Sequence, residues 1–339
     1  MPKYLEIAEL LRSRLARGEY PAGKLPPLRK LAADMGVSYL TARHAVKTLK
    51  EAGWNRTRAA RPLVAMVTPL WAFTEWHRAV RNSTEALGGQ VRFIAYASDT
   101  DPNISEAINE NEYDVIFLSL PDREDSRLLE LVSRENDRVV VMFRDMSMYG
   151  IRSLLGADPV YIERFLELLV ERGHRRIDAF GRDTDIRAGA GDRYRTWRNW
   201  LERHGIEGRF HEMKHQPFVP DDARAADFCR RKFAAEEFGE AVFCFNPTLA
   251  SGFYRACFEH GLVPGRDISV FAFGDQEKAM LMTPALATVM NVGVEETIRD
   301  IIAEYCPGAT RSEVLTFRLK HTEIHEGESI IQTFAGGKR

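Results

Sequence analysis

Two sets of polar side chains in this 339-residue sequence have the types and spacing needed to bind other molecules. The first set lies near the N-terminus, where Tyr39, Arg43 and Lys47 recur every four residues and so share one face of a helix. Arginine on such a face can bind guanine edges or phosphate, and hydroxyl groups can bind phosphate or bases. The residues predicted to contact DNA are Arg29, Ser38, Tyr39, Thr41, Arg43, His44 and Lys47.

The second set follows a series of short apolar segments further along the chain. In open parallel sheets, ligands bind beyond the carboxyl ends of the strands, so the residues after each predicted strand are candidates. Aromatic rings there can stack on the apolar faces of a sugar, while charged and amide groups pair with its hydroxyls. The residues predicted to bind a small molecule, with a carbohydrate as the expected class, are Trp71, Phe73, Arg144, Arg193, Asn246 and Asp275.

The charge distribution separates these two regions. Residues 1–61 carry 13 lysine and arginine residues against 5 aspartate and glutamate residues, a net charge of +8. The rest of the chain carries 34 basic and 44 acidic residues, a net charge of −10. A basic region joined to an acidic one is typical of a nucleic-acid-binding domain attached to a soluble domain. A solvated, lysine-rich surface is the alternative explanation of the charge alone.

The basic region, residues 1–61, has the pattern of three helices. Apolar residues at helical spacing predict a helix over 3–17, and a short second helix begins after Pro27. Gly36 follows where that helix must turn, and Ser38 is a suitable N-cap for the third helix. Helix, short helix, tight turn and helix is the arrangement that places the last helix in the major groove of DNA. A helix-turn-helix domain is therefore predicted.

Residues 62–339 alternate predicted strands with predicted helices. Seven short apolar segments, most of them rich in β-branched or aromatic residues, are separated mostly by segments of helical period. The predicted strands are 63–67, 91–97, 113–120, 138–143, 175–181, 240–246 and 268–274. This alternation predicts an α/β domain with doubly wound parallel sheets, to which the tail at 314–334 adds closing strands.

The motifs do not support catalysis, metal binding or a membrane partner. No nucleophile elbow, P-loop, G-x-G-x-x-G after the first strand or H-E-x-x-H occurs, so no catalytic residue is predicted and an α/β enzyme is the disfavoured alternative. No signal pattern or membrane-spanning run occurs either, which predicts a cytoplasmic protein. No cofactor or metal is predicted, because no Cys-x-x-Cys pair and no histidine at metal-ligand spacing accompanies Cys229, Cys244, Cys257 and Cys306.

The segment GEYPAGKLPPLRKLAADMGVSYLTARHAVKTLKEAGW resembles the DNA-binding head of GntR-type regulators. The resemblance is fairly specific, because the block P-x-G-x-LP-x-x-R-x-LA precedes the turn GVS-x-x-T-x-R. It implies that Arg29, Ser38, Thr41 and Arg43 lie at the DNA. Tyr39 stands where the family often has arginine, which suggests an altered base preference. The β-wing that follows this head in the family is shortened or absent, and the arginines of NRTRAARPLVAMV either contact the DNA backbone or form a charged linker.

Most of residues 110–290 resemble the effector domain of the LacI/GalR family, itself similar to periplasmic sugar-binding proteins. The matching segments include VVVMFRD, ERGHRRIDAFG and GLVPGRDISVFAFGD. The resemblance implies a two-lobed, periplasmic-binding-protein-like fold with a ligand cleft. It also implies that Arg193 is the ligand-gripping arginine, that Asn246 is the ligand-binding asparagine, and that Arg144 lies in the cleft.

Two departures from that family bear on the identity of the ligand. The family usually has Phe-Asp-Asp where this chain has Phe273, Gly274 and Asp275, and the first of those aspartates commonly binds sugar hydroxyls. Either Asp275 compensates from one residue further on, or the ligand is not a simple sugar, or the pocket no longer binds one. The family also usually has aspartate at Pro247, directly after Asn246.

The whole sequence predicts a ligand-controlled, DNA-binding regulator with a helix-turn-helix domain at 1–61 and an effector domain at 62–339. A homodimer is expected to bind a short pseudo-palindromic operator in double-stranded DNA. We expect a repressor that is released from the operator by a small molecule, with a sugar as the expected effector. A small-molecule-binding protein with a degenerate DNA-binding head is the alternative.

Overall fold

The computed structural model places the chain in two compact units. One unit comprises Met1–Leu118, Asp125–Val140 and Ile298–Glu313, and the other comprises Ser119–Glu124, Val141–Thr297 and Val314–Arg339. Each unit is thus assembled from segments that lie far apart in the sequence. The structure describes residues 2–17, 19–20, 25–51, 61–70, 74–98, 100–110, 112–121, 126–134, 137–187, 191–216, 219–306, 309–319 and 321–332.

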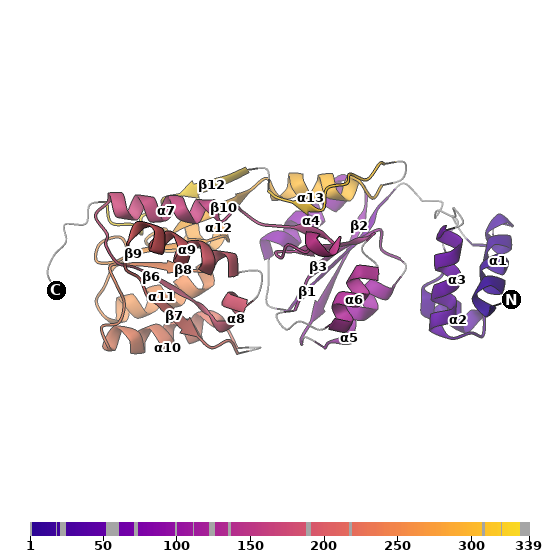
Figure 1. Ribbon diagram of the computed structural model, residues 1–339, viewed down its shortest axis with the longest axis horizontal. Coiled ribbons are helices and arrows are strands. Elements are labelled where there is room, and N and C mark those ends of the chain that lie inside the picture. Colours follow the sequence, from indigo (N-terminus) through magenta and orange to yellow (C-terminus); the bar gives the residue numbers. More distant parts are fainter. Residues whose placement is uncertain are drawn as a thin grey trace. The chain divides into compact units, whose positions relative to one another are not determined.

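Three helices form the N-terminal part of the chain (Figure 1). They are α1 (Lys3–Ala16), α2 (Leu28–Asp34) and α3 (Tyr39–Glu51), which confirms the predicted order of helix, short helix, turn and helix. Their apolar faces meet in one core, in which Leu11, Leu31 and Leu49 are buried. The chain turns between α2 and α3 at Gly36, whose φ of 61° is a backbone conformation that glycine adopts without steric cost.

The first sheet has six strands in the order β11-β5-β4-β3-β1-β2. Its central strands β1, β3 and β4 are buried along nearly their whole length, which explains why they read as continuous apolar runs. Helices α4 (Thr74–Ala86), α5 (Pro102–Asn109), α6 (Ser126–Arg134) and α13 (Val294–Ala303) belong to the same region. The strands are β1 (Leu63–Pro69), β2 (Gln90–Tyr96), β3 (Val115–Ser119), β4 (Val139–Met142), β5 (Arg152–Leu154) and β11 (Thr316–Phe317).

The second sheet also has six strands, in the order β12-β10-β9-β8-β6-β7. Its pairs are parallel except for β12, which runs antiparallel to β10. The strands are β6 (Ile177–Arg182), β7 (Phe210–Met213), β8 (Ala241–Cys244), β9 (Ser269–Phe273), β10 (Ala287–Val292) and β12 (His321–His325). The helices are α7 (Val160–Glu171), α8 (Asp183–Arg187), α9 (Gly191–His204), α10 (Asp221–Ala234), α11 (Pro247–Glu259) and α12 (Gln276–Leu281).

Aromatic side chains fill the core on both faces of the second sheet. On one face, Phe271 of β9 stacks on Phe243 of β8 with ring centroids 4.5 Å apart, and on Phe165 of α7 at 4.9 Å. On the other face, Phe180 of β6 stacks on Phe228 of α10 at 5.4 Å. Helices α7 and α9 therefore cover one face and α10 and α11 the other (Figure 1), as a doubly wound sheet requires.

All seven predicted strands are present, and the structure adds three that the sequence did not reveal, β5, β7 and β10. β5 has only three residues, and β7 alternates buried and exposed residues, as an edge strand does, so neither forms a continuous apolar run. The predicted strands in the tail are reduced to β11 and β12. Across the described ranges, no helix has the length and apolar character needed to cross a membrane. The same residues contain no His, Cys, Asp and Glu group that could hold a metal ion.

The buried side chain of His174, which precedes β6, makes the stability of the fold depend on pH. Its side chain is fully buried, and Nε2 lies 2.9 Å from Ser269 Oγ on β9. Burial lowers the pKa of His174 to about 4. An unfolded histidine binds a proton near pH 6.5, so the unfolded state binds more protons than the folded state as the pH falls between these two values. Stability is therefore retained above pH 6.5 and lost towards pH 4.

We expect the wild-type free energy of unfolding to fall by about 2 kcal/mol from pH 7 to pH 5 through this histidine. The measurement is urea unfolding at both pH values for the wild type and for His174→Gln, whose side chain does not titrate. The variant should show a smaller decrease by about that amount. If both proteins lose the same stability, His174 does not enter the fold as a neutral imidazole.

Candidate functional site

Ser38 and Thr41 stabilise the start of α3, directly after the turn that joins it to α2. Ser38 Oγ accepts a hydrogen bond from Thr41 N at 3.1 Å, which satisfies one of the free N–H groups at the start of α3. The Ser38 and Thr41 hydroxyls are also 2.8 Å apart. Ser38 therefore caps α3 as predicted, and both hydroxyls lie at the N-terminal end of the helix, the end that contacts base edges in helix-turn-helix proteins.

The other predicted DNA-contacting residues of α3 differ in exposure. His44 and Lys47 are exposed and Arg43 is partly buried. Tyr39 departs from its expected outward position, because it packs against the helix core and its hydroxyl donates to Asn109 O at 3.2 Å. Burial raises the pKa of Tyr39. Of the residues of α3 that are predicted to contact DNA, Arg43, His44 and Lys47 therefore contribute most to the surface of the helix.

Arg29 of α2 is exposed but already has an acidic partner. Its Nη2 lies 2.5 Å from Glu106 Oε1 on α5. The hydrogen bond and the charge of Glu106 raise the pKa of Arg29. The carboxylate of Glu106 therefore offsets part of the charge that Arg29 would offer to a DNA phosphate.

The carboxyl edge of the second sheet brings two of the predicted ligand-binding residues together. Arg193 Nη1 donates to Phe245 O at 2.6 Å, directly after β8, and its guanidinium carbon lies 4.5 Å from the ring centre of Phe273 at the end of β9. Asn246, the next residue after Phe245, caps α11 by accepting from Leu249 N at 2.9 Å. These residues come from α9, from the end of β9 and from the connection between β8 and α11, and they converge because β8 and β9 are neighbours in the sheet.

Burial governs the electrostatics of Arg193. The side chain is largely enclosed, and the loss of hydration lowers its pKa to about 10. The guanidinium is still charged at neutral pH, because the pKa stays well above 7. A charged group that is enclosed and has hydrogen-bonding capacity left is suited to binding a polar ligand.

Of the remaining predicted ligand residues, only Asp275 and Arg144 lie in the described part of the chain. Asp275 is exposed, has a φ of 45° and caps α12, with its carboxylate 3.3 Å from Lys278 N. Arg144 is partly buried and follows β4 of the first sheet. Trp71 and Phe73 lie outside the described residues.

Two residues at the same edge were missed in the sequence. Lys278 Nζ donates to Thr248 Oγ1 at 3.1 Å, in the first turn of α11. Asn291 is the penultimate residue of β10, and its Oδ1 accepts from Ala157 N at 3.1 Å. α12 has six residues and β10 was not predicted, so no periodic pattern pointed to either position.

A groove of about 900 Å³ lies between α7 and α9, in the unit that contains the second sheet. Its walls carry charges of both signs that already pair with one another, such as Arg203 with Glu163 at 2.8 Å and Arg318 with Asp158 at 3.8 Å. Because these charges are balanced within the protein, the groove has less to offer a polar ligand than the sheet edge.

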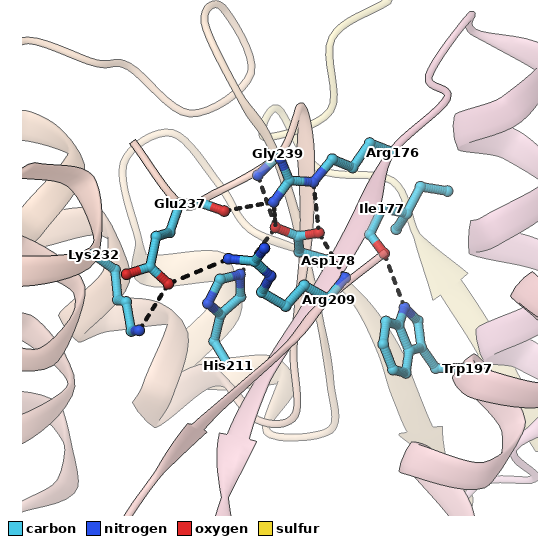
Figure 2. A network of polar contacts seen from close by, with 9 residues as sticks. All are labelled: Arg176, Ile177, Asp178, Trp197, Arg209, His211, Lys232, Glu237 and Gly239. Atoms are coloured by element: carbon cyan, nitrogen blue, oxygen red, sulfur yellow. Dashed lines mark hydrogen bonds and ion pairs between the residues drawn. The ribbon is translucent and has the colours of Figure 1, made fainter. Parts of the chain in front are cut away.

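A buried polar network supports the strands behind the site (Figure 2). Asp178 of β6 is fully buried, and its carboxylate accepts from Arg176 Nε at 3.1 Å and Nη2 at 3.0 Å, from Arg209 N at 2.9 Å and from Gly239 N at 2.8 Å. His211 Nε2 of β7 lies 2.9 Å from the same carboxylate. The network fastens β6 to β7 and to the segment before β8.

The same region positions the helix that carries Arg193. Trp197 Nε1 donates to Ile177 O at 3.1 Å (Figure 2), and the indole ring is fully buried. Arg193 precedes Trp197 by four residues, so both side chains lie on the same face of α9. Trp197 therefore fixes α9 against β6 and directs Arg193 to the sheet edge.

Comparison with known proteins matches both parts of the chain. Residues 3–61 match the family of bacterial regulatory proteins called gntR, and residues 166–306 match the periplasmic binding protein-like domain. The chain resembles a LacI family transcriptional regulator from Bifidobacterium animalis subsp. lactis, at 16% identity and a TM-score of 0.65, over 80% of this chain and 98% of that one. A periplasmic binding protein/LacI transcriptional regulator from Alkaliphilus metalliredigens, solved with D-xylulofuranose, gives 14% identity, a TM-score of 0.65, and coverage of 80% and 99%. These structures share the fold.

Several curated relatives are repressors by name. The probable HTH-type transcriptional repressor ExuR of Bacillus subtilis is 27% identical over 187 residues, which are 54% of either chain. The HTH-type transcriptional repressor PurR of Vibrio atlanticus is 33% identical over 122 residues, 36% of this chain and 35% of that protein. The chain thus spans about half of the first relative and about a third of the second. The lactose operon repressor of Rhizobium radiobacter is 38% identical over 80 residues, 23% of this chain and 70% of that protein. The chain therefore belongs to the bacterial regulatory proteins that join a gntR-family DNA-binding head to a periplasmic binding protein-like domain.

Proposed function

We propose that this protein is a cytoplasmic transcriptional repressor whose affinity for its operator is controlled by a small molecule. The observation that carries the proposal is the capped α2-turn-α3 unit, which presents Arg43, His44 and Lys47 on the surface of α3 in a region of net charge +8. The relatives named as repressors support regulation rather than catalysis as its role. We place the DNA-binding domain at 1–61 and the effector domain at 62–339, in keeping with the gntR-family match that ends at residue 61.

The effector domain binds its ligand at the carboxyl edge of the second sheet. Arg193 and Asn246 lie there, and Phe273 provides an aromatic ring beside them. Polar groups next to an aromatic ring suit a carbohydrate or a carbohydrate derivative. The related fold from Alkaliphilus metalliredigens, solved with D-xylulofuranose, supports this class of ligand.

The protein acts as a homodimer on double-stranded DNA. A dimeric helix-turn-helix protein places its two recognition helices about one turn of DNA apart, so the operator should consist of two inverted half-sites about 10 base pairs from centre to centre. The dimeric lac repressor, which has this effector fold, was solved bound to its operator, and this supports the arrangement.

The experiment is selection of random duplexes by the purified full-length chain at a stated salt concentration, followed by sequencing. We expect enrichment of one pseudo-palindrome with that half-site spacing. Binding that is weak, salt-sensitive and without any enriched sequence would contradict the proposal and would favour a small-molecule-binding protein with a degenerate DNA-binding head.

A further inference from the structure

A cation without a carboxylate partner lies at the carboxyl edge of the second sheet. Among the described residues, Arg193 forms no ion pair, and only one of its N–H groups donates to a protein acceptor, Phe245 O. Its guanidinium lies over the Phe273 ring, which covers one side. A guanidinium has five N–H groups in a planar fork that matches carboxylate and phosphate, so the side chain can bind more than the protein provides.

The carboxylates near Arg193 are engaged with other cations. Asp185 pairs with Arg182 at 2.7 Å and accepts from Arg182 N at 2.9 Å. Asp192, which precedes Arg193 in the sequence, pairs with Arg195. Asp185 and Asp192 therefore form their ion pairs with other arginines, and neither forms an ion pair with Arg193.

Within the described part of the chain, no carboxylate pairs with Arg193 at the sheet edge beside Phe273. The next residue is Gly274, and a Cβ atom there would have its nearest neighbour, Asn291 Nδ2, at 3.7 Å, an ordinary contact. Asp275 follows, but it is exposed and caps α12. Space alone therefore does not exclude a side chain at Gly274, but its φ of 86° is a backbone conformation that favours glycine.

A second cation lies at the same place. Lys278 Nζ donates to Thr248 Oγ1, and Arg193 donates to Phe245 O, so both cations are bound to the segment that begins α11. α11 has 13 residues and its N-terminal end carries a partial positive charge. Arg193, Lys278 and the helix end bring positive charge to this edge, while Asp275 and Glu277 at the start of α12 carry negative charge.

We propose that the effector is an anionic carbohydrate derivative, whose carboxylate or phosphate group binds Arg193. The proposal rests on the proposed function, because it names the class of molecule that controls operator binding. A ligand anion forms charge-assisted, bidentate hydrogen bonds with the guanidinium and supplies the missing countercharge. A neutral sugar would leave an enclosed cation uncompensated, which is unfavourable.

The test is calorimetric titration of the full-length chain at constant ionic strength. The ligands are D-glucose, D-glucuronate and D-glucose 6-phosphate, which differ at one carbon, and the same three forms of D-galactose. Inorganic phosphate serves as a probe that does not depend on sugar stereochemistry. We expect saturable binding of phosphate and tighter binding of at least one anionic sugar than of its neutral counterpart. Tighter binding of a uronate identifies a carboxylate ligand, and tighter binding of a sugar phosphate identifies a phosphate ligand.

Two variants assign the binding to this site. Arg193→Gln should weaken anion binding by about 30-fold or more, the loss typical when one partner of an enclosed, hydrogen-bonded charge pair is removed. Gly274→Asp adds a carboxylate beside Phe273 and should weaken anion binding by about 100-fold, the scale of an unfavourable like-charge contact. Gly274→Ala is the matched control, because it imposes the same backbone demand at a φ of 86° without adding charge. The basic head is unchanged in all variants, so differences between them report on the sheet edge.

The outcomes separate this inference from the proposed function. No saturable anion binding, or equal anion affinity in Gly274→Asp and Gly274→Ala, overturns the inference. A neutral sugar that binds more tightly than both of its anionic forms also overturns it, while operator control by that sugar would leave the proposed function intact. Conversely, anion binding that depends on Arg193 but does not alter operator affinity supports the inference and contradicts ligand control.

Discussion

Replacing Arg43 by alanine is expected to weaken binding of the selected operator by about 2–6 kcal/mol, because one bidentate guanine contact contributes about 1–3 kcal/mol and a dimer carries two copies of α3. Arg43 lies one turn after the capped start of α3, at the end of the helix that reaches base edges. The measurement is fluorescence anisotropy with the operator and with a scrambled duplex at one salt concentration. The loss should be much larger on the operator than on the scrambled duplex.

Arg12→Ala is the matched control, since it removes the same charge from the same three-helix domain. Arg12 lies on α1, where it is exposed and pairs with Glu9 at 3.4 Å. Loss of one charge from α1 should lower both affinities slightly and equally, through the salt-dependent, sequence-independent part of binding. If Arg43→Ala has the same small and equal effect as Arg12→Ala, α3 is not the recognition helix.

Replacing Asp178 by asparagine is expected to destabilise the effector domain by about 3–5 kcal/mol, the range for breaking a buried, hydrogen-bonded charge pair. The carboxylate accepts from Arg176, from Arg209 N and from Gly239 N, whereas asparagine would direct an N–H₂ group at some of these donors. The measurement is urea unfolding monitored by far-UV circular dichroism, with ligand absent.

Asp227→Asn is the control for Asp178→Asn. Asp227 is exposed on α10, where it pairs with Arg230 at 2.7 Å, and exposed pairs contribute little to stability. The pH dependence gives a second check. Burial raises the pKa of Asp178, but hydrogen bonds from His211, Arg209 N and Arg176 outweigh it and lower the pKa overall. Stability from this group is therefore present above about pH 4 and is lost as the pH falls further. Equal stability of the two asparagine variants would mean that the network contributes no more than a surface pair.

The three-helix head was predictable because its signals are local. Helical periodicity, the Gly36 turn and the Ser38 cap all act within a few residues, and each is present in the structure. The position of Tyr39 was not predictable, since its partner Asn109 lies 70 residues away in the sequence. The same reason explains why Arg29 gave no sign of its pair with Glu106.

The sequence predicted that the ligand site lies at the carboxyl edge of the sheet, but it did not predict which side chains there are free to bind a ligand. Parallel strands end at a common edge, so Asn246 could be placed there from the strand pattern, and the family resemblance pointed to Arg193. That pattern does not show which side chains are used as helix caps, as Asn246 and Asp275 are. It also does not reveal the Asp178 network, whose donors come from three separate segments of the chain.

The linkage between ligand and operator tests the central claim most directly. The Kd of the full-length chain for the selected operator is measured with and without saturating concentrations of each sugar that binds in the titrations, and the Kd of that sugar is measured with and without operator. The account predicts a change of about 5–150-fold in operator Kd, with the same factor in the sugar Kd, because coupling between two sites is reciprocal. An operator Kd that no bound sugar changes would contradict ligand control of this protein.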